Sequence, residues 1–296
     1  MSAPDGKRRV RVSAGELAVL DIGEPDAPAV LFVHGFPTSS FLWRSLVPML
    51  PPAMRAIVPD VLGAGDSDKP DGVPLGIRAQ AGYLGELLDG LGLGRVAVVG
   101  HAHGGGVAQL LAMEGRAELL VLIDTIAFDT WPSEPMRELQ QLVVRDGAMV
   151  DALIGSAFDI GMAHRDRLAR EAVAEYQRPF RGDEGVKAFA RWATSFDGVG
   201  LAGREDELAA LDIPVFILWG EDDPFMPPES ADRLNELIPR SGLALLPGCK
   251  HFLPEEAPQT LAPLLYEYLR SQYAGLPHTH QAGPTTVELG RSYREE

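Results

Sequence analysis

The sequence predicts an α/β protein built on a mostly parallel sheet. Short apolar runs alternate along the chain with longer segments of helical periodicity, which is typical of this class. Most of these runs are continuously apolar, as strands are when helices cover both faces of a sheet. With 296 residues, 46% of them hydrophobic, the chain can bury a large core. We therefore expect one large domain, or one domain that carries an insertion.

Eight strands are expected. The first two runs, RVRVSA at 9–14 and ELAVLDIG at 16–23, alternate apolar and polar residues and predict a half-exposed antiparallel hairpin. Six further runs predict buried parallel strands; they are AVLFVHG at 29–35, RAIVPD at 55–60, RVAVVG at 95–100, LLVLID at 119–124, PVFILWG at 214–220 and GLALLPG at 242–248.

The long stretch from 125 to 213 lacks a strand signal and is rich in Ala, Arg and Glu at helical spacing. Because it is too long for a simple connection, it predicts a helical cap inserted between two strands. We expect a core of 1–127 and 213–273, a cap of 128–212, and a tail of 274–296 without apolar periodicity that should be mobile. The last predicted helix is TLAPLLYEYLRSQY at 260–273.

Charge and cysteine content bound the possible partners. A formal net charge of −16 argues against a nucleic-acid-binding surface. The single cysteine, Cys249, excludes an internal disulfide and fits a reducing compartment. The first residues lack the apolar stretch of a signal peptide or a membrane anchor, so we expect a cytoplasmic protein without a membrane partner. His278 and His280 in the tail are too few to predict a metal site, and no cofactor is expected.

A strand, a sharp turn and a helix are predicted where the chain reads VAVVGHAHGGGVAQLLA, at 96–112. Enzymes mount nucleophiles in this setting, with positive φ at the apex and small neighbours around it, which accounts for Gly100, Gly104 and Gly105. The apex residue here is Ala102, which carries no nucleophilic group. A glycine-rich turn of a nucleotide-binding fold is the alternative interpretation.

The segment His34-Gly35-Phe36-Pro37 favours the catalytic interpretation. It follows the apolar run at 29–33, and Gly35 lets the backbone turn closely. The N–H of Phe36 would then lie beside the elbow and form an oxyanion hole with the N–H of His103.

Asp223 and His251 each lie just past a predicted buried strand near the end of the core. A carboxylate and an imidazole at consecutive strand ends can meet over the elbow. Asp223 would fix the tautomer of His251, and His251 would serve as base. Taken singly, the first is a typical helix-capping residue and the second a typical surface histidine, but their order and context favour a catalytic pair.

Together these motifs resemble the α/β-hydrolase superfamily over about residues 8–273, and within it the haloalkane dehalogenase and epoxide hydrolase branch. The resemblance implies an eight-stranded, mostly parallel sheet with a helical cap, and a nucleophile–histidine–acid triad without a cofactor. The branch usually has aspartate at the elbow, which attacks an sp³ carbon to form an ester that water hydrolyses. The serine branch has serine there. The segments that carry the resemblance are HGFPTSSFLWR at 34–44, DVLGAGDSDKP at 60–70, GHAHGG at 100–105, GEDDPFMP at 220–227 and GCKHFLPEEAP at 248–258.

Departures from the family pattern reduce the number of reactions that the resemblance implies. Dehalogenases commonly hold the halide with residues at the slots that are His103 and Phe36 here, so dehalogenation is disfavoured. Epoxide hydrolases commonly use two cap tyrosines, and the predicted cap contains Tyr176, so His103 or another donor would have to replace the second. Asp124 lies where some dehalogenases carry their acid, and it is the alternative partner of His251.

Ala102 has three explanations that the sequence leaves open. It is an engineered replacement of aspartate or serine, or it is a natural loss that leaves a ligand-binding protein. In the third, no nucleophile is needed, because His251 and Asp223 can abstract a proton as in a cofactor-independent lyase or isomerase. By the covalent mechanism the chain as written should be inert.

The expected partner is a small, uncharged and mostly apolar molecule, and a homodimer is left open. We expect five residues to contact this substrate: His34, Trp131, Tyr176, Trp192 and Phe252. Other cap aromatics could roof the pocket, although such spacing is more typical of a cap core; they are Phe158, Phe180, Phe189 and Phe196.

Overall fold

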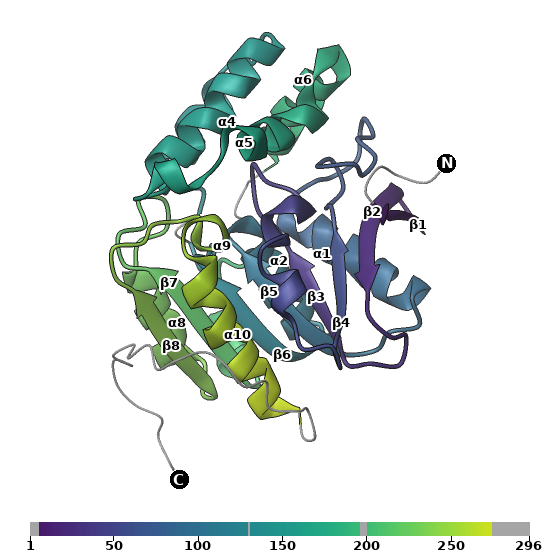
Figure 1. The fold of residues 1–296 in the computed structure, drawn as a ribbon, viewed down its shortest axis with the longest axis vertical. Helices are drawn as coiled ribbons and strands as arrows, with labels where there is room; N and C mark the ends of the chain where they lie inside the picture. Colours follow the sequence, from purple (N-terminus) through teal and green to yellow (C-terminus); the bar gives the residue numbers. More distant parts are fainter. Residues whose placement is uncertain (1–5, 130, 196–199, 274–296) are drawn as a thin grey trace.

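An eight-stranded sheet forms the centre of the molecule in the computed structural model (Figure 1). The structure describes residues 6–129, 131–195 and 200–273. The predicted tail with His278 and His280, and Phe196 of the cap, lie outside the described residues. The strands are β1 Arg8–Val12, β2 Gly15–Ile22, β3 Ala29–Val33, β4 Arg55–Pro59, β5 Val96–His101, β6 Ala117–Ile123, β7 Val215–Gly220 and β8 Ser241–Leu246.

The strand order is β1-β2-β4-β3-β5-β6-β7-β8. β1 and β2 pair antiparallel with each other, and β2 pairs antiparallel with β4. Every later pairing is parallel, from β4–β3 through to β7–β8. The predicted fold class is therefore confirmed, with its N-terminal hairpin and its six parallel strands.

Helices cover both faces of the sheet, and a further group lies between β6 and β7 in the chain. The core helices are α1 Ile77–Gly90, α2 His103–Met113, α8 Glu229–Leu237, α9 Leu253–Glu256 and α10 Pro258–Gln272. The inserted helices are α3 Glu134–Gln141, α4 Gly147–Gly161, α5 Arg170–Gln177, α6 Gly182–Thr194 and α7 Glu205–Ala209. Short 3₁₀ turns are η2 Ser40–Trp43, η3 Val47–Met49, η4 Arg165–Arg167 and η5 Arg178–Phe180. No helix in the described ranges is both long and apolar enough to cross a membrane.

Alternation along each strand builds two hydrophobic cores. In β3, Leu31 and Val33 join the core that contains α1 and α2, whereas Val30 and Phe32 join the core that contains α10. Successive side chains of a strand point to opposite faces, so a strand covered by helices on both sides must be apolar throughout. This requirement explains the continuously apolar runs in the sequence.

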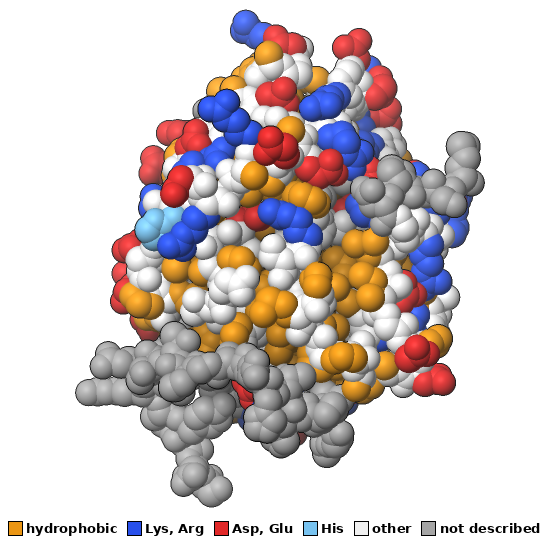
Figure 2. All heavy atoms as spheres, in the orientation of Figure 1, with side chains coloured by type: hydrophobic (Ala, Val, Ile, Leu, Met, Phe, Trp, Pro, Cys, Tyr) orange, Lys and Arg blue, Asp and Glu red, His pale blue; other side chains and the backbone are white. Residues whose placement is uncertain are grey.

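The inserted helices α4, α5 and α6 stand together at one end of the sheet (Figure 1), and we call residues 128–212 the cap. Ion pairs tie the cap to the core: Arg178 of η5 contacts Asp66 at 2.8 Å. On the face shown in Figure 2, basic and acidic side chains are interspersed over the cap helices. The exact domain boundaries remain a prediction, but the insertion point between β6 and β7 is the one that the sequence indicates.

Candidate functional site

The turn between β5 and α2 has the strained geometry expected of a nucleophile elbow. Ala102 has φ of 52° and ψ of −118°, and it is 3% exposed. A non-glycine residue at positive φ costs about 1–3 kcal/mol and persists where surrounding contacts enforce it. The carbonyl of Ala102 accepts N–H groups from Gly105 at 3.0 Å and Ile126 at 3.2 Å, and its own N–H donates to Ile123 at 3.0 Å. These bonds hold the turn in place.

Glycines around the elbow permit close packing of the backbone. A Cβ on Gly35 would lie 2.8 Å from the Cβ of Ala102 and 3.1 Å from the nitrogen of His103. A Cβ on Gly104 would lie 2.2 Å from the carbonyl oxygen of Val33. The loop after β3 is thus pressed against the elbow, which brings the backbone near Phe36 and the backbone of His103 to one place.

Asp223 and His251 form a buried hydrogen-bonded pair. Nδ1 of His251 lies 2.8 Å from Oδ2 of Asp223, and their side chains are 3% and 0% exposed. Oδ1 of Asp223 accepts the backbone N–H groups of Phe225 at 2.8 Å and Met226 at 3.0 Å. With Asp223 as the acceptor, Nδ1 of His251 carries the hydrogen and Nε2 is left as the basic nitrogen.

Asp124, the alternative acid, makes a different bond. Its Oδ1 accepts the backbone N–H of Gly220 at 2.7 Å, and its Oδ2 has no hydrogen-bond partner among the described residues. Burial, together with the nearby charge of Asp223, raises the pKa of Asp124 well above its usual range. Asp124 therefore holds its proton more tightly than an ordinary aspartate and fixes the end of β7, whereas the hydrogen bond to His251 comes from Asp223.

A cavity of about 170 Å³ lies between the elbow and the cap. From the core it is lined by Phe36, Pro37, Ala102, His103, His251 and Phe252. From the cap it is lined by residues including Trp131, Met136, Leu139, Leu153, Ile160 and Phe189. None of the described side chains that line it is an acid, a lysine or an arginine. The site therefore suits an uncharged, mostly apolar molecule placed directly over Ala102.

His103, directly after the elbow, adds a polar ring to this wall. Burial lowers the pKa of His103 to about 3, so its imidazole is neutral at ordinary pH. Trp131 and Phe252 also line the cavity, as the sequence leads us to expect, and both are buried.

The structure corrects the expectation for Tyr176, which does not line the cavity. Its hydroxyl donates to Glu255, which also forms an ion pair with Arg44, with Nη2 2.7 Å from Oε2. Burial and the charge of Glu255 raise the pKa of Tyr176. A tyrosine held in this buried cluster cannot protonate a molecule above Ala102.

Trp192 and His34, which were also expected to contact the substrate, do not line the cavity. Trp192 packs behind it, with its ring 5.0 Å from that of Phe36. Nε2 of His34 accepts the backbone N–H of Val61 at 3.0 Å, and burial lowers the pKa of His34 to about 4. Both residues lie behind the residues that line the cavity. Their position in the sequence alone could not show whether they contact a bound molecule or pack behind those residues.

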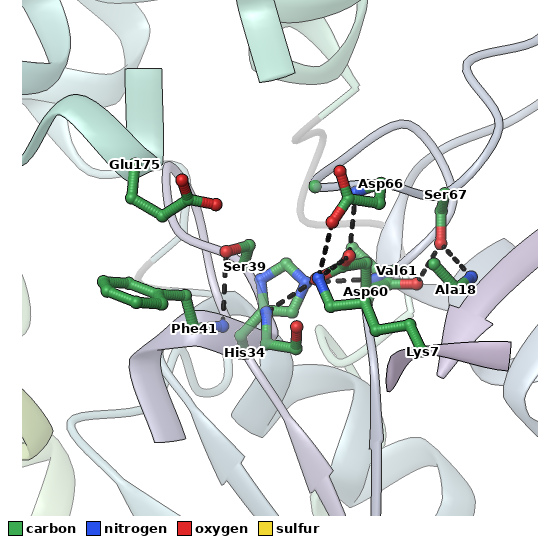
Figure 3. A network of polar contacts seen from close by, with 12 residues as sticks. Lys7, Ala18, His34, Ser39, Phe41, Asp60, Val61, Asp66, Ser67 and Glu175 are labelled. Atoms are coloured by element: carbon green, nitrogen blue, oxygen red, sulfur yellow. Dashed lines mark hydrogen bonds and ion pairs between the residues drawn. The ribbon is translucent and has the colours of Figure 1, made fainter. Parts of the chain in front are cut away.

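His34 belongs to a buried polar network at the base of the loop after β3 (Figure 3). Asp60 lies 2.8 Å from Nζ of Lys7, and its other oxygen accepts the backbone N–H of Ser40 at 2.7 Å. Lys7 also contacts Asp66 at 2.8 Å. Because Ser40 begins η2, directly after the loop that carries Phe36, the network fixes that loop from below.

Several cavity residues were not predicted. Met136 and Leu139 come from α3, and Phe225 follows Asp223 by two residues. The apolar spacing of Met136 and Leu139 in a polar helix was the available signal for α3. Phe225 lies within the GEDDPFMP motif, next to the acid.

Proteins named as hydrolases are among the known proteins with related sequences. Haloalkane dehalogenase 2 of Mycobacterium tuberculosis is 29% identical over 279 residues, which cover 86% of this chain and 92% of that protein. A soluble epoxide hydrolase of a Corynebacterium species is 30% identical over 254 residues, covering 78% of this chain and 86% of that protein. The crystal structure of an α/β hydrolase fold protein from Burkholderia ambifaria matches with a TM-score of 0.78 at 27% identity, covering 88% of this chain and 97% of that one.

A family model described as the alpha/beta hydrolase fold matches residues 28–258. This range contains the elbow, the loop after β3, the cap and both members of the Asp223–His251 pair. With the matched range spanning well over half of its length, the chain belongs to the α/β hydrolase fold family.

Proposed function

We propose that the cavity above Ala102 is a hydrolase site for small, uncharged, mostly apolar molecules, with position 102 as the slot for the nucleophile. One observation carries the proposal: Ala102, His103, His251 and Phe36 line the same cavity, and Ala102 keeps the positive φ of an elbow. His251 is the general base, Asp223 orients it, and the backbone N–H groups of Phe36 and His103 form the oxyanion hole.

The covalent reaction needs a side chain that Ala102 lacks. With serine at position 102, Nε2 of His251 would take the hydroxyl proton as the oxygen attacked an ester or lactone carbonyl. The tetrahedral oxyanion would be held by the two N–H groups, the C–O bond to the leaving group would break, and His251 would return the proton to that oxygen. Water activated by His251 would then hydrolyse the acyl group.

With aspartate at position 102, the carboxylate would instead open an epoxide at an sp³ carbon. The opened epoxide oxygen must then receive a proton. Tyr176, the expected donor, is held by Glu255 outside the cavity, which leaves His103 as the polar side chain beside the slot. The position of Tyr176 favours ester or lactone substrates over epoxides. Halide release is disfavoured because His103 and Phe36 fill the slots where halide-binding side chains are expected.

The test is turnover by three proteins: the chain as given, Ala102→Ser and Ala102→Asp. Each is assayed with one panel of esters, lactones, epoxides and haloalkanes. We expect the given chain to be inert and one replacement to turn over, and the substrate class that it accepts identifies the reaction. If all three are inert while folded, the hydrolase assignment is wrong and a non-catalytic ligand-binding site is the better account.

The complete Asp223–His251 pair also supports a second function. Proton abstraction by His251, with the oxyanion hole holding an enolate, would need no nucleophile. This lyase or isomerase chemistry predicts that the chain as given is active and that His251→Ala abolishes the activity.

A further inference from the structure

We propose that His101 is a positioning residue, which sets the place of His251 relative to position 102. The proposal rests on the proposed role of His251 as base. His101 is the last residue of β5, directly before the elbow, and it is completely buried. Neither its hydrogen bond nor its ring contact enters the mechanism described above.

His101 joins the elbow strand to the loop that carries the base. Its Nε2 lies 2.9 Å from the carbonyl oxygen of His251, 150 positions away in the sequence. The two imidazole rings are also in contact, with centroids 4.9 Å apart. Two strands, β6 and β7, separate β5 from β8 in the sheet. This side chain therefore reaches across the strand ends and links the base loop directly to the elbow.

The bond fixes the tautomer of His101. A carbonyl oxygen can only accept, so Nε2 of His101 must carry the hydrogen and Nδ1 must be the bare nitrogen. Nδ1 is buried without a hydrogen-bond partner among the described residues. Burial, reinforced by the proximity of His251, keeps His101 neutral by holding its pKa well below the usual range.

The unpaired Nδ1 argues against a purely stabilising role. A buried acceptor without a partner costs about 1–3 kcal/mol, and an apolar side chain would avoid this cost. The other side chains of β5 before Gly100 are Val96, Ala97, Val98 and Val99, all apolar. The hydrogen bond from Nε2 to the carbonyl oxygen of His251 explains why a histidine stands at the end of this strand.

Other contacts hold the base loop to different neighbours. The N–H of Asp222 donates to Cys249 at 3.0 Å, which ties the loop to the acid segment. The N–H of Phe252 donates to Gly161 at 3.2 Å, which ties it to the cap. Neither contact reaches β5 or the elbow. His101 thus supplies the link that sets the base against the nucleophile slot, and misplacement of a base by about 1 Å can cost a factor of about 100 in rate.

The test compares His101→Leu with His101→Gln, whose amide N–H can replace the Nε2–H. The matched control is His164→Leu, which removes an exposed cap histidine. In the chain as given, amide hydrogen exchange of residues 249–253 is measured by mass spectrometry. We expect exchange in this segment to be about tenfold faster in His101→Leu, near the original rate in His101→Gln, and unchanged in the control.

The same replacements are then made in the Ala102→Ser background, where covalent labelling by a fluorophosphonate reports on the base. We expect His101→Leu to lower the maximal labelling rate about 100-fold without changing the half-saturating concentration, and His101→Gln to restore it. Unchanged exchange at 249–253 in folded His101→Leu overturns the proposal. A full labelling rate in that variant does the same. If the Ala102→Ser parent does not label at all, the serine form of the proposed function fails, and the exchange result alone decides whether His101 positions the loop.

Discussion

The Nδ1 atom of His251 lies 2.8 Å from Oδ2 of Asp223. The other carboxylate oxygen of Asp223, Oδ1, accepts hydrogen bonds from two backbone N–H groups. The carboxylate therefore has one orientation, and it imposes one tautomer on the histidine. In the proposed function, this arrangement leaves Nε2 as the nitrogen with which His251 would act as base.

Asp223→Asn should remove this control of the tautomer. In the Ala102→Ser background we expect the rate of fluorophosphonate labelling to fall by about 1000-fold or more, because the amide can donate to Nδ1 and place the hydrogen on Nε2. Stopped-flow or intact-mass kinetics measure the rate. Asp212→Asn, at an exposed surface pair, is the control and should label at the parent rate. Equal rates for the two variants would show that Asp223 does not orient the base.

Asp124→Asn tests the raised pKa of Asp124. Its folded-state pKa lies above the ordinary value of 3.8, so the folded protein keeps this proton to higher pH than the unfolded chain does. The parent should therefore lose stability relative to the asparagine variant as the pH rises from about 4 toward neutrality, and below that range the difference should be constant. Urea unfolding from pH 3.5 to 7.5 measures it. A difference that does not vary with pH would mean that the pKa of Asp124 is not raised in the folded protein.

Ala102→Gly tests the strain at the elbow. Glycine adopts φ of 52° and ψ of −118° without the clash of a Cβ, so we expect the free energy of unfolding to rise by about 1 kcal/mol. Ala79→Gly in α1 is the comparison, because there the same change should cost about 1 kcal/mol. Denaturant titrations of both variants give the two values. If Ala102→Gly is destabilising to the same degree as Ala79→Gly, the elbow is unstrained.

Cys249 should be an unreactive thiol. It is 8% exposed, and burial raises the pKa of its thiol to about 11. At pH 8 we expect reaction with a disulfide reagent to be on the order of 100-fold slower than for an exposed cysteine, with full reaction of one thiol in denaturant. Rapid reaction of the folded protein would show that the loop before His251 opens readily, which would contradict the burial of Cys249.

Much of this site could be predicted because its signals are local. Each parallel strand is an apolar run, and the motifs of the candidate site occur just after such runs, where strand ends converge. Asp223, His251 and the backbone near Phe36 could be placed from their position after a strand. The elbow could be placed because close packing demands glycine at 100, 104 and 105; a Cβ on Gly100, for example, would lie 2.5 Å from the carbonyl oxygen of Gly104.

Side-chain direction in the cap could not be predicted in the same way. Tyr176 and Trp192 lie on helices whose orientation over the core depends on long-range contacts such as the hydrogen bond from Tyr176 to Glu255. An apolar period identifies a buried helix face but does not say whether that face meets the cavity or the cap interior. The link from His101 to His251 was missed for a similar reason, since a hydrogen bond to a backbone carbonyl 150 positions away leaves no motif.

The central claim is that position 102 is a nucleophile slot served by His251, and labelling of the Ala102→Ser protein with a fluorophosphonate tests it without knowledge of the substrate. Attack by the activated hydroxyl on phosphorus expels fluoride and adds the phosphonyl group, which peptide mass spectrometry locates. We predict one adduct per chain at position 102, which is lost when His251→Gln is added, and none in the chain as given. A folded Ala102→Ser protein that remains unlabelled, or that labels equally well without His251, would contradict the account.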